Sequence, residues 1–74
     1  MSKKSDLKKA IADSEYEIAE LEKKRGRSQS AIMEAIITNQ KPSEEEIKYF
    51  KIFTSHIATE RENLRKLREE LNNL

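Results

Sequence analysis

The sequence predicts an all-α protein, an antiparallel two-helix hairpin that assembles into a four-helix bundle as a homodimer or docks on a partner. Charged residues make up 39% of the 74 residues and aromatic residues 5%, with one glycine and one proline, which is typical of exposed helices rather than of β-sheets. Apolar residues recur at spacings of three and four, as on one face of a helix. The single proline, Pro42, divides this pattern into two segments of similar length. A chain this short buries a small core, so we expect a partner to contribute to its stability.

The first helix is expected over about residues 6–38, after a flexible N-terminus at residues 1–5. Ser5 can cap this helix, and Asp6 in its first turn complements the helix dipole. The helix should end near Thr38, because Pro42 disfavours helical geometry at the residue before it. The positions expected to face the second helix, which we call the seam, are Leu7, Ile11, Ser14, Ile18, Leu21, Arg25, Ser28, Ile32 and Ala35.

The second helix is expected over about residues 44–73, after a loop at residues 39–43, so that residues 6–74 form a single hairpin domain. Ser43 followed three residues later by Glu46 is a capping-box pattern, which predicts a helix start. The loop is short, so the two helices should be antiparallel neighbours. The seam of the second helix comprises Phe50, Phe53, Ile57, Glu60, Leu64, Leu67, Leu71 and Leu74.

Residues 23–30, KKRGRSQS, interrupt the apolar pattern with four cations around the only glycine. Pairing the two seams outward from the loop places Leu21 opposite Glu60, with Arg25 one turn away. A polar pair of Arg25 and Glu60 would fix the register of two heptad-patterned helices, whose neighbouring registers bury similar leucines. We therefore expect Arg25 and Glu60 to be a register-setting pair.

Two other hypotheses for this segment stay open. One is a helix break at Gly26, which would give three helices, although the seam spacing continues through the glycine. The other is a nucleic-acid contact through Lys23, Lys24 and Arg27, although no aromatic side chain that could stack on bases lies nearby in the sequence.

The segments that flank the loop, residues 31–37 and 47–53, are apolar on more than one helix face. The inner face there is expected to contain Ile32, Ala35, Ile36, Ile47, Phe50 and Phe53. Four further side chains have no inner position, and the short polar loop cannot cover them: Met33, Ile37, Tyr49 and Ile52. The predicted partner or oligomer interface comprises Met33, Ile36, Ile37, Ile47, Tyr49, Phe50, Ile52 and Phe53.

The sequence carries no pattern of catalytic chemistry. His56 is the only histidine and cysteine is absent, whereas a catalytic zinc site needs three protein ligands. No glycine-rich phosphate loop is present. We expect no enzyme activity, no cofactor, no metal and no small-molecule substrate. No run of 18 apolar residues and no signal-peptide pattern occur, so we expect a cytoplasmic protein with no membrane partner.

These observations predict a non-enzymatic protein–protein interaction module, an adaptor, co-chaperone or inhibitor that binds itself or another protein through its loop end. The alternative is a dimeric nucleic-acid-binding regulator that uses residues 23–27, although a net charge of +1 gives no strong attractive field. In length and hairpin outline the chain resembles two groups of small helical hairpins. They are the dimeric plasmid-copy regulators that bind RNA loops and the co-chaperones that hold needle subunits of type III secretion systems.

Overall fold

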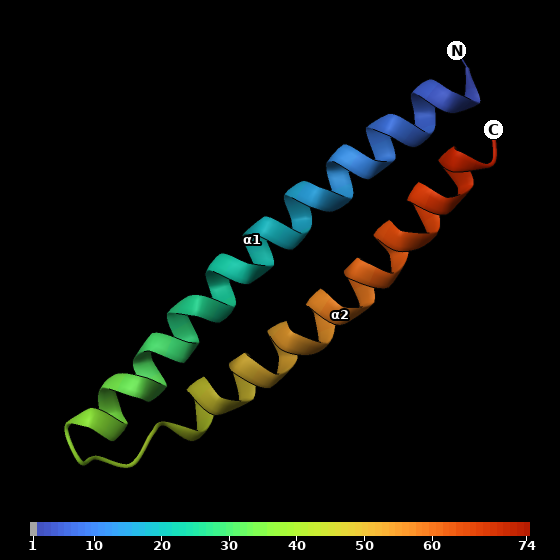
Figure 1. Cartoon of the computed structure of the whole chain (residues 1–74). Coiled ribbons are helices and arrows are strands. Elements are labelled where there is room, and N and C mark those ends of the chain that lie inside the picture. Colours follow the sequence, from blue (N-terminus) through green and yellow to red (C-terminus); the bar gives the residue numbers. More distant parts are fainter. Residues whose placement is uncertain (1) are drawn as a thin grey trace.

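The structure is a computed structural model that describes residues 2–74. It contains two helices, α1 (Lys3–Ile37) and α2 (Glu44–Asn72), and no strand occurs within those residues. The helices lie side by side and run antiparallel, with the two chain ends together and the loop at the far end (Figure 1). The hairpin is a thin rod of 55 × 16 × 14 Å. The predicted all-α hairpin is confirmed.

The start of α1 lies at Lys3, one turn earlier than the sequence predicts. Ser2 is the N-cap, and its hydroxyl accepts a 3.1 Å hydrogen bond from the backbone N–H of Ser5. The expected cap at Ser5 is wrong, and residues 3–5 are helical rather than part of a separate N-terminal segment. A serine is an equally good N-cap at either position. With Ser2 as the cap, α1 is one turn longer than it would be with Ser5. The remaining residue of the expected flexible segment, Met1, lies outside the described residues.

The middle of α1 continues without interruption through Gly26. The glycine does not have a positive φ, so its backbone is helical and the hypothesis of a helix break is wrong. A glycine inside a helix costs only about 1 kcal/mol relative to alanine. A break at the glycine would cost more than this. The helix on both sides of Gly26 packs on α2 in one register, and a break would remove part of that packing.

The loop between the helices is closed by side-chain caps at both ends. The hydroxyl of Thr38 donates a 2.9 Å hydrogen bond to the carbonyl oxygen of Glu34. Asn39 then takes a φ of 61°, the left-handed conformation that asparagine tolerates better than most residues. Ser43 caps α2 by accepting a 3.4 Å hydrogen bond from the backbone N–H of Glu46. The predicted start of the second helix is confirmed.

The core is a single row of side chains between the helices. Ile57 is the most buried, with 1% of its surface exposed. All of the buried residues occupy predicted seam positions: Leu7, Ser14, Ile18, Leu21, Ser28, Ile57 and Leu64. Only five of these seven are apolar, so the core is thin and is interrupted by polar residues. Along most of its length each helix is covered on one side only, by the other helix.

Candidate functional site

The register of the hairpin is set by a different polar pair from the expected one. Glu60 accepts a 2.8 Å hydrogen bond from Ser14 Oγ across the seam and a 3.3 Å hydrogen bond from Asn63 Nδ2. The predicted pairing of Glu60 with Arg25 is wrong, since Arg25 makes no ion pair or side-chain hydrogen bond anywhere in residues 2–74. Ser14 is buried and its hydroxyl needs an acceptor, whereas half-buried Arg25 can reach water with its guanidinium group.

The pair also changes which residues meet across the seam. Glu60 was expected opposite Leu21, and Ser14 lies about two helical turns closer to the chain ends. The sequence signal for this contact was the serine itself. A small hydroxyl residue inside an apolar seam requires a hydrogen-bond partner, and Glu60 is the acidic residue on the facing seam.

Ion pairs mark the two edges of the seam. Arg61 pairs with Glu22 at 2.8 Å, and Arg68 pairs with Glu15 at 3.4 Å. Each of these four residues directly follows a seam residue, so the positions that follow the seam on the two helices meet along one edge. We call this the glutamate edge. On the opposite edge Lys3 pairs with Glu70 at 3.6 Å, and Glu70 directly precedes a seam residue.

The apolar residues near the loop are divided between these two edges. Ile36 follows the seam residue Ala35 and lies two heptads after Glu22 on α1. Ile47 lies two heptads before Arg61 on α2, so both isoleucines continue the glutamate edge. Met33 lies three residues before Ile36, on the same side of α1. We call Met33, Ile36 and Ile47 the isoleucine face.

The opposite edge carries a second apolar group. Tyr49 precedes the seam residue Phe50, and Ile52 lies three residues further along the same side of α2. Ala31 precedes the seam residue Ile32 in the same way on α1. Because a helix turns by about 100° per residue, positions before and after the seam point to opposite sides of the hairpin. We call Ala31, Tyr49 and Ile52 the tyrosine face.

Five of the eight residues of the predicted interface are exposed, and three are half-buried. Seven large apolar side chains are exposed among residues 2–74, and five of them lie near the loop: Met33, Ile36, Ile37, Tyr49 and Ile52. Ile36 was expected on the inner face but is 58% exposed, because it follows Ala35 and turns out along the edge. The other predicted interface residues, Ile47, Phe50 and Phe53, are half-buried. The Phe53 ring stacks on the Tyr49 ring with centroids 6.3 Å apart.

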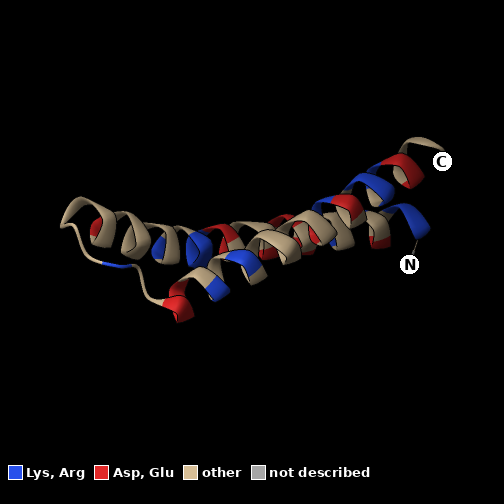
Figure 2. Cartoon of the chain, turned by 90° about the horizontal axis from the view of Figure 1, so that it is seen from below, with Lys and Arg blue, Asp and Glu red and all other residues tan. Residues whose placement is uncertain are grey.

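The basic segment lies beside the tyrosine face. Lys23, Lys24 and Arg27 are exposed, and Lys23 pairs with Glu20 at 3.5 Å. Within residues 2–74, Lys24 and Arg27 form no ion pair. Lys24 precedes the seam residue Arg25, so it shares the edge that carries Tyr49. Figure 2 shows basic residues on the loop half of α1 and an acidic first turn of α2 beside the loop.

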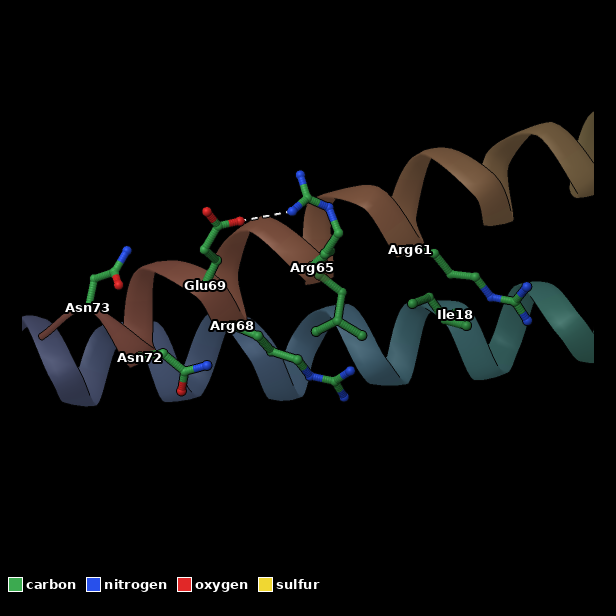
Figure 3. Close-up of a pocket in the computed structure, with 8 residues that line it drawn as sticks. Ile18, Arg61, Arg65, Arg68, Glu69, Asn72 and Asn73 are labelled. Carbon is green, nitrogen blue, oxygen red and sulfur yellow. Dashed lines mark hydrogen bonds and ion pairs between the residues drawn. The ribbon is translucent and has the colours of Figure 1, made fainter.

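Three arginines on the C-terminal half of α2 form ion pairs within the molecule. A groove there is lined by Arg61, Arg65, Arg68 and their neighbours, and Figure 3 shows Arg61 and Arg68 extending over α1 while Arg65 points to the other side. Arg65 bonds Glu62 and Glu69 on its own helix. Its hydrogen bond lowers the pKa of Glu62 and raises the pKa of Arg65. The groove therefore offers no unpaired arginine among its lining residues.

Within residues 2–74, no group of three histidine, cysteine, aspartate or glutamate side chains is placed to hold a metal ion. Neither α1 nor α2 contains the long apolar stretch that a membrane crossing requires.

Comparisons of the chain with protein-family models, with curated proteins and with solved structures found no match. The fold and the surface therefore define the class by themselves: a short helical hairpin with a thin core, paired charges toward the chain ends and exposed apolar side chains toward the loop.

Proposed function

We propose that this protein is a non-enzymatic protein–protein interaction module, of the adaptor, co-chaperone or inhibitor type, that binds through its loop end. The observation that carries the proposal is the concentration of exposed apolar side chains there, five of the seven on the described surface. Contiguous exposed apolar side chains mark interaction sites in soluble proteins. Among the described residues the hairpin buries five apolar side chains, so burial of the loop end by a partner would add substantially to a small core.

Side-chain geometry also supports a preorganised surface. The hydroxyl of Tyr49 donates a 3.3 Å hydrogen bond to Glu45 Oε1, and the ring rests on Phe53. Because its hydroxyl is hydrogen-bonded and its ring is stacked, the Tyr49 side chain loses little conformational freedom when a partner covers it. Aromatic side chains in such positions often provide much of an interface's binding energy.

A pull-down with the immobilised hairpin tests the proposal. Wild-type protein should retain specific proteins from an extract of the source cells. Replacement of Tyr49→Ala with Ile52→Ala, or of Met33→Ala with Ile36→Ala, should remove at least some of them because these side chains form the apolar surface. Unchanged retention by both double variants, with helicity preserved by circular dichroism, would refute the proposal.

The alternative function is a dimeric nucleic-acid-binding regulator, and the observation that favours it is the exposed cationic group of Lys23, Lys24 and Arg27. Its test is Lys23→Glu with Lys24→Glu. That variant should lose a salt-sensitive interaction with RNA or DNA under the alternative. It should retain the proteins captured by wild type under the main proposal.

A further inference from the structure

The tyrosine face has an ordered distribution of charge along the hairpin. On α1 the exposed side chains run from Glu34 near the loop, through Ala31, to Arg27. On α2 they run from Glu45 through the apolar pair Tyr49 and Ile52 to His56. These residues are separated by three or four positions, so they lie along one side of each helix. The face is therefore acidic toward the loop, at Glu34 and Glu45, apolar in the centre, and basic toward the middle of the hairpin at Arg27 of α1.

We propose that this face binds a second copy of the same chain, in an isologous dimer whose two hairpins run antiparallel. This proposal rests on the proposed function, because it assigns one of the two apolar loop-end faces to self-association. A two-fold axis requires a surface that is complementary to itself. A face that is acidic at one end and basic at the other meets that requirement when the second copy is turned end over end.

The spacing of the charges matches such an axis on α1. Glu34 and Arg27 lie at equal distances from the midpoint between residues 30 and 31. An axis through that midpoint places Glu34 of each copy against Arg27 of the other. Ala31 lies next to the axis, and its small side chain allows two antiparallel helices to approach closely.

The spacing on α2 has the same symmetry. Tyr49 and Ile52 lie at equal distances from the midpoint between residues 50 and 51, and so do Glu45 and His56. An axis through that midpoint would place Tyr49 of each copy on Ile52 of the other. The cross-helix ion pairs on the two edges put the axis set by Glu34 and Arg27 about one helical turn nearer to the loop on α2, where Tyr49 lies next to it.

The same charges argue against a partner of a single sign. An acidic partner helix would complement Arg27 and Lys24 but would meet Glu34 and Glu45 at the other end of the face. A basic partner has the opposite conflict. Only a partner that is basic at one end and acidic at the other suits this face, and a second copy of the chain is such a partner. The isoleucine face stays outside the dimer and is available to another protein.

Sedimentation velocity over a wide concentration range tests the dimer and its charge pairs. Wild-type protein should form a concentration-dependent dimer, and Arg27→Glu or Glu34→Arg should each weaken it by about tenfold, because two attractive pairs become repulsive. An equimolar mixture of the two single variants should form a heterodimer, and the variant with both changes should dimerise like wild type. The matched apolar control is Met33→Ala with Ile36→Ala, which should leave the dimer intact, whereas Tyr49→Ala with Ile52→Ala should abolish it.

A covalent test locates the axis. The chain contains no cysteine, so Ala31→Cys introduces a single thiol beside the axis, where two copies approach closely enough for a disulfide. Oxidation should convert this variant to a covalent dimer far faster than the variant Ile37→Cys, whose thiol lies away from the face. A wild-type monomer at all concentrations, charge reversals without effect, or equal cross-linking of the two cysteine variants would overturn the dimer. None of these results bears on capture of a different protein through the loop end, which the pull-down tests separately.

Discussion

Ser14 Oγ lies 2.8 Å from Glu60 Oε1 and donates a hydrogen bond that joins α1 to α2 through their seams. Ser14 is 4% exposed, so its hydroxyl would lose its hydrogen bond to water on folding and gain none without Glu60. A shift of one heptad in either direction would bring the serine from Glu60 to an apolar residue, Phe53 or Leu67. The contact therefore opposes sliding of the two helices, a motion that an apolar seam with a repeating pattern resists only weakly.

Replacement of Ser14 by alanine should lower the free energy of unfolding by about 1 to 2 kcal/mol, because it removes a hydrogen bond to a charged group at a part-buried site. Urea unfolding monitored by circular dichroism measures the change. Ser30→Ala is the matched control, since Ser30 is an exposed serine on the same helix and reports the gain in helix propensity alone. Equal effects of the two substitutions would show that the contact with Glu60 contributes nothing.

Ile57→Ala should be the most destabilising apolar truncation in the hairpin. Ile57 is 1% exposed and is the most buried side chain of the described core. Isoleucine-to-alanine changes at buried sites cost about 2 to 5 kcal/mol, which is a large part of the stability of a domain this small. Ile37→Ala, at a site that is 73% exposed, is the control and should have little effect. Thermal unfolding followed at constant protein concentration distinguishes the two.

Local sequence signals predicted most of the fold. Ser43 and Glu46 specify the start of α2 because a cap acts over three residues and needs no tertiary contact. The unbroken seam through Gly26 favoured a continuous helix for the same reason. The cap of α1 was misplaced because Ser2 and Ser5 offer equal caps one turn apart, and local propensity does not choose between them.

Contacts between the helices were harder to predict. Repeating seams allow registers that differ by whole turns, so Glu60 had both Arg25 and Ser14 as possible partners, and burial of Ser14 decided between them. Ile36 was placed inside because its segment is apolar all round, but only the packing of Ala35 against α2 determines which neighbour is turned outward. The division of the apolar surface into two faces follows from that same packing.

Gly26→Ala should stabilise the hairpin by about 1 kcal/mol. An added Cβ would meet no atom within 4 Å, and the glycine already has a helical backbone. The gain comes from the lower conformational entropy of the unfolded chain, so helicity and melting temperature should rise together. A fall in melting temperature would show that the glycine is needed for a bend that the continuous helix does not contain.

The carboxyl group of Glu62 should titrate below its ordinary pKa of 4.5, because Arg65 donates hydrogen bonds to the charged form. Since the folded-state pKa is lowered, the stabilisation from this pair is present above the ordinary value and is lost as the pH falls through the lowered value. Carbon-detected NMR titration of the side-chain carboxyl group measures it. Arg65→Met should return the pKa toward 4.5, whereas Lys66→Met, which removes a weaker and more distant charge, should raise it less. The same pKa in wild type and in the Arg65 variant would show that the ion pair does not persist in solution.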